Sequence, residues 1–148
     1  MNKAAAELGV ELIIYEVRSD DEIAAIADNI PAEADAVFLV RSGSITSHAA
    51  SIVDAATALG IPVGSTVVEL GEEGVVVAYG ATYYSLGKQA THLADQIARG
   101  ASAADLPIET GDPFLMVNLH TANLIGLPIS DEILQQAETL IRDYADGS

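Results

Sequence analysis

Short apolar runs alternate along the chain with segments in which apolar residues recur at helical spacing. The runs are typical of β-strands, and the periodic segments are typical of amphipathic helices. The expected strands span residues 10–17, 36–40, 61–63, 74–80 and 114–118, with a further extended segment at 107–110. The expected helices span residues 3–8, 20–30, 47–59, 82–99, 121–124 and 131–144.

Residues that begin and end helices stand at the boundaries of these segments. Ser19 and Glu22 have the spacing of a capping box before the helix expected at 20–30. Gly9, Gly60 and Gly126 follow expected helices, and glycine readily adopts the left-handed backbone that ends a helix. Because strands and helices alternate with short connections, we predict an α/β fold, a three-layer α/β/α sandwich around a mainly parallel sheet.

The composition agrees with a single compact unit and excludes several partners. The chain has 148 residues, and half of them are hydrophobic, which is enough to build a core. The 22 acidic residues outnumber the 6 basic residues and give a net charge of −16. Such a charge repels phosphate backbones and anionic lipids, so we expect neither nucleic acid nor a membrane surface as a partner.

The usual patterns of thiol, metal and cofactor sites are missing from the sequence. It has no cysteine, which excludes disulfides and thiolate metal sites. His92 and His120 have no partner at metal-ligand spacing, and no dinucleotide or P-loop fingerprint occurs. We therefore expect no metal and no cofactor. No apolar run approaches the roughly 18 residues of a membrane-spanning helix, and Met1 to Val10 lacks the pattern of a signal peptide.

Three loops are expected to meet at one edge of the predicted sheet. The carboxyl ends of parallel strands share an edge, where loops and helix N-termini present free N–H groups. The loops are Arg41–Thr46, Ser65–Thr66 and Gly80–Tyr83, and they carry hydroxyl groups, one cation and an aromatic side chain. Such a surface is suited to a small solute. The alternative is that these are ordinary turn and cap residues.

A histidine that follows the first of these loops offers a different function. Thr46–Ala50, followed by Leu59–Val63, resembles the phosphohistidine domain of phosphoenolpyruvate-utilising phosphotransferases, with the pattern T-S-H-A-A and then L-G-x-P. In that family His48 would carry the phosphoryl group, which the nearby helix N-terminus would stabilise. The preceding Ser42–Ile45 lacks the Gly-Gly of that family. A phosphotransfer domain using His48 therefore stands as an alternative.

A second resemblance covers nearly the whole chain. Residues 79–89 are similar to the pattern G-x-D-Y-Y-x-L-G-R-Q, and residues 104–110 to A-D-I-P-V-E-T. The segments 97–100 and 117–122 are similar to I-L-x-G and V-V-N-L-x-x-A. These patterns resemble the ABC-transporter substrate-binding proteins of the tryptophan/phenylalanine-binding type, a branch of the type 1 periplasmic-binding-protein fold.

This resemblance implies a two-lobed receptor that binds a small organic solute between its lobes and delivers it to an ABC permease. Such a receptor catalyses no reaction and is extracytoplasmic, at the periplasm or the cell surface. Residues 1–106 would then be the second, ligand-binding lobe without its first strand, and residues 107–148 a hinge and a C-terminal return segment with the final helix. We expect this chain not to be the complete precursor of such an exported protein.

The strand that the resemblance leaves out has a structural consequence. In the common 2-1-3-4-5 order it would be central, so its absence would leave unpaired N–H and C=O groups in the sheet. We therefore expect the chain to form homo-oligomers or to swap segments between copies through the position of the missing strand.

The resemblance also implies which residues line the cleft. The Asp-Asn pair of the family falls on Ser42-Gly43, and the Asp of G-x-D-Y-Y falls on Thr82, so carboxylates that would suit an ammonium group are missing. Arg41 would instead face a carboxylate or a phosphate. A third alternative is an α/β interaction domain with no ligand. The residues expected to bind the solute are Arg41, Ser42, Ser44, Thr66, Thr82 and Tyr83.

Overall fold

The structure is a computed structural model that describes residues 2–142. The strands are β1 (Val37–Leu39), β2 (Val63–Ser65), β3 (Val77–Gly80), β4 (Phe114–Asn118) and β5 (Ala137–Ile141). The α-helices are α1 (Asn2–Leu8), α2 (Asp20–Ala27), α3 (Gly43–Ser47), α4 (Ala49–Ala58), α5 (Tyr83–Ala98), α6 (Leu119–Leu124) and α7 (Asp131–Gln136). Two short 3₁₀-helices are η1 (Val68–Gly71) and η2 (Ala103–Asp105).

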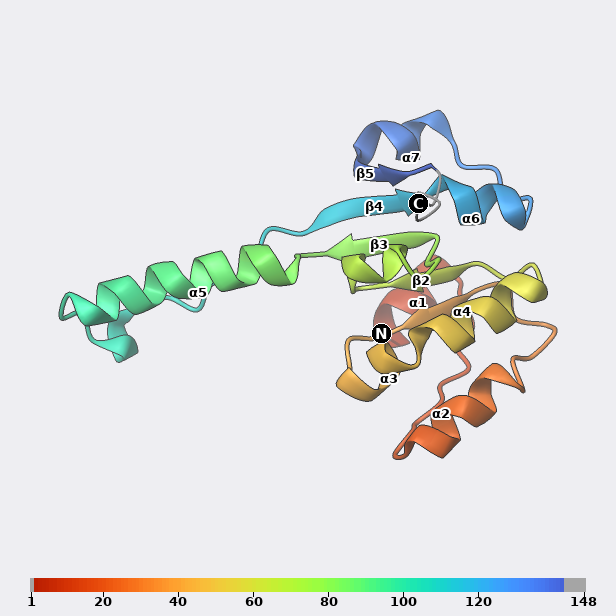
Figure 1. The fold of residues 1–148 in the computed structure, drawn as a ribbon, viewed down its shortest axis with the longest axis horizontal. Coiled ribbons are helices and arrows are strands. Elements are labelled where there is room, and N and C mark those ends of the chain that lie inside the picture. The colour runs from red at the N-terminus through yellow and green to blue at the C-terminus, as the bar shows by residue number, and fades with distance from the viewer. Residues whose placement is uncertain (1, 143–148) are drawn as a thin grey trace, which may run out of the picture.

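The strands form one sheet in the order β1-β2-β3-β4-β5. Strands β1, β2 and β3 are parallel to one another, β4 is antiparallel to β3, and β5 is parallel to β4. Figure 1 shows α2, α3 and α4 on the β1 and β2 side of the molecule, whereas α5 extends away from the sheet beyond the end of β3. The prediction of an α/β fold with a mainly parallel sheet is confirmed.

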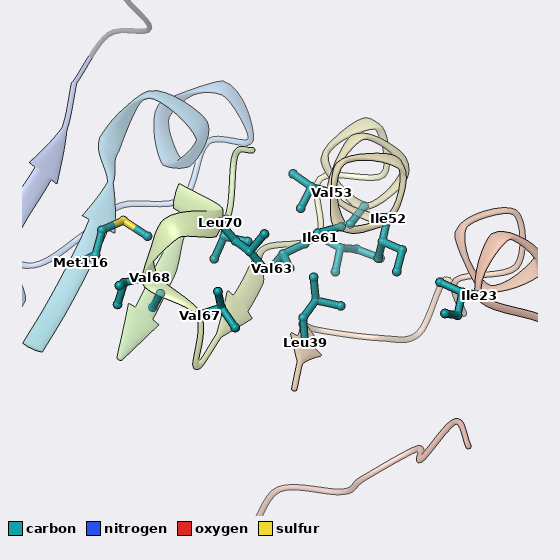
Figure 2. Packing of buried hydrophobic residues seen from close by; sticks show 14 residues of the cluster. Ile23, Leu39, Ile52, Val53, Ile61, Val63, Val67, Val68, Leu70 and Met116 are labelled. Carbon is teal, nitrogen blue, oxygen red and sulfur yellow. The ribbon is translucent and has the colours of Figure 1, made fainter. Parts of the chain in front are cut away.

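The hydrophobic core joins the sheet to α4 and η1. One row of register partners crosses β1 to β4, and each of its residues is at most 5% exposed: Leu39, Ser65, Ala78 and Met116. The helix α4 adds Ile52 and Val53 to the same cluster. Figure 2 shows the cluster continuing from Met116 on β4, past the middle of the sheet, to Ile23 on α2. Burial of these side chains holds the three parallel strands in a fixed order.

Several helix boundaries follow from capping residues. The Ser19 hydroxyl accepts a hydrogen bond from the Glu22 N–H at 3.3 Å, and the Glu22 carboxylate accepts one from the Arg18 N–H at 2.7 Å. Gly9, Gly60 and Gly126 have φ angles of 68°, 73° and 71°, in the left-handed region that glycine adopts without steric cost. The predicted N-cap at Ser19 and the glycine helix ends are confirmed, whereas the Glu22 carboxylate bonds the N–H of Arg18 and not that of Ser19 as in a capping box.

The prediction of a strand at residues 10–17 is wrong. This segment has no regular secondary structure and pairs with no strand of the described chain, and the sheet ends at β1. A strand needs a hydrogen-bonding neighbour, and apolar sequence alone does not supply one. As a result Leu12, Ile13 and Ile14 are exposed by 37%, 56% and 60%.

The prediction of one helix over residues 131–144 is also wrong. The helix α7 ends at Gln136, and residues 137–141 turn into strand β5 beside β4. Pairing with β4 outweighs the modest helical propensity of this segment, which contains β-branched Thr139 and Ile141. The predicted end at Tyr144 lies outside the described residues.

Smaller differences concern the segment around His48 and the strand that follows. The helix expected at 47–59 is interrupted at His48, which has a non-helical conformation, and α4 begins at Ala49. Part of the loop expected at 41–46 is helical instead, because α3 covers Gly43–Ser47. The strand expected at 61–63 forms two residues later, at Val63–Ser65. Tertiary pairing with β1 sets this register, which the apolar pattern alone cannot do.

Gly80 permits a close approach between β3 and the loop after β2. A Cβ atom at Gly80 would collide with the Thr66 carbonyl oxygen, whereas one at Gly87 on α5 would meet nothing within 4 Å. We predict that Gly80→Ala lowers the free energy of unfolding by about 1–3 kcal/mol, because the backbone must shift. Gly87→Ala is the control and should raise it by about 0.5–1 kcal/mol. Urea unfolding followed by circular dichroism measures both, and an unchanged Gly80→Ala variant would contradict the close approach.

Candidate functional site

The carboxyl ends of β1, β2 and β3 lie at one edge of the sheet. Their register pairs Leu39 with Ser65 and Ser65 with Ala78, so the loops that follow begin side by side. These loops are the three that the sequence singles out, at 41–46, 65–66 and 80–83. We call this edge, with its loops, the rim.

Arg41 connects all three loops of the rim. Its Nη2 donates hydrogen bonds to the Thr66 carbonyl oxygen at 3.2 Å and to the Ala81 carbonyl oxygen at 3.4 Å. Its guanidinium carbon lies 4.7 Å from the centre of the Tyr83 ring, in the geometry of a cation–π contact. The side chain therefore holds the end of β1 against the loop after β2 and the start of α5.

Buried Ser65 and half-buried Gly80 bring these loops together. The Ser65 hydroxyl is 2% exposed, donates to the Leu39 carbonyl oxygen at 3.1 Å and accepts from the Val67 N–H at 3.0 Å. Gly80 leaves the space in which the Thr66 backbone approaches β3. Ser65 and Gly80 therefore fix the position of Thr66. The half-buried side chain of Thr66 lies at the rim.

The third loop is organised by the start of α5. The Thr82 hydroxyl accepts from the Ser85 N–H at 3.0 Å and caps the helix. The Glu69 carboxylate of η1 accepts from the Tyr83 N–H at 2.8 Å. Glu69 is a rim residue that the sequence did not predict. No local signal could have revealed it, because its partner is 14 residues away.

Ser42 and Ser44 follow Arg41 in sequence, but residues 43–46 of the predicted loop belong to helix α3, so only Ser42 lies on a loop. Ser42 is the residue before α3, and its side chain makes no capping hydrogen bond. Ser44 is exposed, and its carbonyl oxygen accepts from the Ser47 hydroxyl at 3.0 Å. Among the described residues, no hydrogen bond joins either hydroxyl to Arg41, Thr66 or Tyr83. The structure brings Arg41, Thr66, Thr82 and Tyr83 into one cluster, and it leaves Ser42 at the start of α3 and Ser44 within that helix.

The His48 side chain hydrogen-bonds to the preceding helix, α3. Its Nδ1 lies 2.9 Å from the Ser44 carbonyl oxygen, which can only accept, so this nitrogen carries a proton. The ring is half-buried between α3 and α4. Its contacts are therefore those of a residue that stabilises the junction of two helices.

Metal binding, a surface depression and membrane insertion are the other features on which the described residues bear. Within residues 2–142, no group of three or more histidine, aspartate or glutamate residues is placed to hold a metal ion. A shallow, open depression on α5 is lined by Tyr83, Tyr84, Gly87, Lys88 and Thr91. In the same range, no helix is both long enough and apolar enough to cross a membrane.

Comparison with known families and structures shows what this arrangement is related to. The family model described as ABC transporter substrate binding protein matches residues 1–141. The chain belongs to this family. Substrate-binding proteins of the family bind small-molecule solutes, work with ABC permeases and are generally not enzymes. Membership therefore favours solute binding over the phosphotransfer alternative at His48. A search of curated proteins found no match.

Solved structures share the fold at low sequence identity. A conserved domain protein from Vibrio cholerae has a TM-score of 0.83 and 20% identity over 94% of this chain. An ABC domain from Streptococcus pneumonia, in complex with L-Trp, has a TM-score of 0.83 and 22% identity over 94%. The ligand-free, open structure of CD0873, an adhesive substrate-binding protein from Clostridium difficile, has a TM-score of 0.69 and 19% identity over 97%. The chain covers 47%, 48% and 48% of those proteins, about half their length.

We predict that Arg41→Ala lowers the free energy of unfolding by about 1 kcal/mol, because two hydrogen bonds and the ring contact are lost. Arg99→Ala serves as a control, since Arg99 makes an exposed ion pair with Asp95 at 2.8 Å on α5. That variant should change stability by less than about 0.5 kcal/mol. Urea unfolding of the two variants gives the comparison, and equal effects would show that Arg41 does not hold the rim together.

Proposed function

We propose that this substrate-binding protein uses the rim as one wall of a solute-binding cleft. The observation that carries the proposal is the junction at Arg41, where one side chain links loops from three parallel strands. Ligands of open α/β sheets bind beyond the carboxyl ends of the strands, which is where the rim lies. The related ABC domain with L-Trp supports a small organic solute as the ligand.

The chemistry of the rim favours a solute with an anionic group. Arg41 uses Nη2 for the two carbonyl oxygens, and within residues 2–142 no partner is recorded for the N–H groups of its Nη1 and Nε. A guanidinium that is already oriented can donate a pair of hydrogen bonds to a carboxylate or phosphate. Ser42, Ser44, Thr66 and Thr82 supply hydroxyl groups, and Tyr83 supplies a ring for a planar solute.

The proposal extends to the whole receptor. The opposite wall of the cleft would come from a second lobe, and the closed receptor would deliver its solute to an ABC permease outside the cytoplasm. Residues 1–106 would belong to the ligand-binding lobe and residues 107–148 to the hinge and return segment. Membership of the family and the length of the solved relatives support this assignment. A free edge at β1 supports association through an added strand.

Binding can be tested with aromatic carboxylic acids, each compared with its neutral amide, and with L-Trp. We expect the acids to raise the melting temperature of the chain and to shift the NMR signals of rim residues, and we expect the amides to do neither. Arg41→Gln should weaken binding about tenfold or more, because a charge-assisted hydrogen-bond pair is lost. Thr82→Asp should also weaken it, since a carboxylate can still cap α5 but repels an anion.

The matched control for this experiment is His48→Ala, which lies outside the Arg41 cluster and should leave binding unchanged. If His48→Ala abolished the response while Arg41→Gln and Thr82→Asp had no effect, the rim would not be the binding wall. Transfer of phosphate from phosphoenolpyruvate to His48 by a partner kinase domain, detected as acid-labile phosphate, would restore the alternative of a phosphotransfer domain.

A further inference from the structure

The start of α5 lies at the rim, in a position where α/β proteins often bind a phosphate group. The first N–H groups of a helix have no partner within the helix and attract anions, together with the positive end of the helix dipole. In this chain two of these groups are already occupied. The Tyr83 N–H donates to the Glu69 carboxylate at 2.8 Å, and the Ser85 N–H donates to the Thr82 hydroxyl at 3.0 Å. A carboxylate of the protein itself therefore lies where an anionic ligand would bind.

The backbone that carries Glu69 is fixed to the core. Glu69 belongs to η1, and its neighbours Val68 and Leu70 are 6% and 4% exposed. The Gly71 carbonyl oxygen, at the end of η1, accepts a hydrogen bond from the buried Asn118 side chain at 2.9 Å. The buried side chains and this hydrogen bond hold η1 in one position beside the start of α5.

The negative charge of Glu69 is not neutralised within residues 2–142. Glu69 is exposed, and no basic side chain of this range forms an ion pair with it. Tyr83 links this charge to Arg41, because its backbone N–H contacts the Glu69 carboxylate and its ring contacts the guanidinium. An anion bound by the Nη1 and Nε groups of Arg41 would therefore lie near a fixed negative charge.

We propose that Glu69 makes the rim favour solutes with a monoanionic carboxylate over solutes with a phosphate dianion. This selectivity rests on the proposed function, in which Arg41 binds the anionic group of a solute. A carboxylate needs only the pair of N–H groups that one guanidinium offers. A phosphate monoester has a third oxygen and a second negative charge. At the rim that oxygen would meet occupied N–H groups on α5 and the Glu69 carboxylate.

Lys88 is a second basic side chain on this side of α5. It lines the shallow depression together with Tyr83 and Tyr84. Lys88 follows Tyr83 by five residues, which is about 7.5 Å along the helix axis. Glu69, by contrast, contacts the Tyr83 backbone directly. Because the nearer charge acts more strongly, Glu69 should outweigh Lys88 in its effect on an anion at Arg41.

Glu69→Gln tests the selectivity, because an amide oxygen can still accept from the Tyr83 N–H after the charge is removed. The probes are benzoate, with one negative charge, and phenyl phosphate, which has two at pH 8 because its second pKa is about 6. NMR titration at constant ionic strength gives both dissociation constants. We expect the wild type to bind benzoate at least about tenfold more tightly than phenyl phosphate.

Removal of the Glu69 charge should affect the two probes differently. Glu69→Gln should strengthen benzoate binding about threefold and phenyl phosphate binding about tenfold, because Coulomb energy is proportional to the charge of the ligand. The preference for benzoate should therefore fall about threefold. Glu138→Gln is the matched control, since it removes one exposed charge from β5, at the opposite edge of the sheet from β1. It should leave the preference unchanged, and circular dichroism shows whether each variant is folded.

Arg41→Gln separates this selectivity from the proposed function. If Arg41→Gln weakened benzoate binding but Glu69→Gln left the preference unchanged, the role of Glu69 would be wrong and the binding wall would stand. Benzoate binding that does not depend on Arg41 would overturn both. A wild-type chain that binds neither probe, or binds phenyl phosphate as tightly as benzoate, would also overturn the selectivity.

Discussion

The parallel pairing of β1, β2 and β3 over a shared apolar core is the constraint on which the rest of the structure depends. Leu39 and Ala78 face this core. Ser65 lies between them, and its buried hydroxyl hydrogen-bonds to the Leu39 carbonyl oxygen and the Val67 N–H. Because the strands are parallel and in register, their carboxyl ends must lie at the same edge. Loops that are far apart in sequence are thereby brought into contact.

The rim shows how backbone approach and side-chain chemistry act together. Gly80 lets the Thr66 backbone come close to β3, and Arg41 then reaches carbonyl oxygens on both loops. Tyr83 is held from two directions, by the guanidinium above its ring and by the Glu69 carboxylate at its N–H. These contacts hold the Arg41 guanidinium in one orientation before a solute binds.

Strand β1 is the last strand on its side of the sheet that residues 2–142 form. Its carboxyl end leads to Arg41 and the rim, and its outer edge has no partner among the described residues. Additional pairing at β1 would bury Phe38 and Val40, which are otherwise half exposed.

The alternation of strands and helices, the capping residues and the location of the three loops were predictable from sequence. Each depends on neighbouring residues: Ser19 and Glu22 lie within one turn, and Gly9, Gly60 and Gly126 end their helices through local backbone geometry. The shared edge of Arg41, Thr66 and Tyr83 was also predictable, because parallel topology alone requires it.

Only the tertiary structure decided which apolar segments become strands and which side chains meet. Residues 10–17 have the composition of a strand but lack a neighbour, and residues 137–141 have helical neighbours but pair with β4. Glu69 enters the rim through a hydrogen bond to Tyr83 that no local pattern encodes. Sequence determines local propensity, but a strand and a site both require partners brought from elsewhere in the chain, and only the fold supplies them.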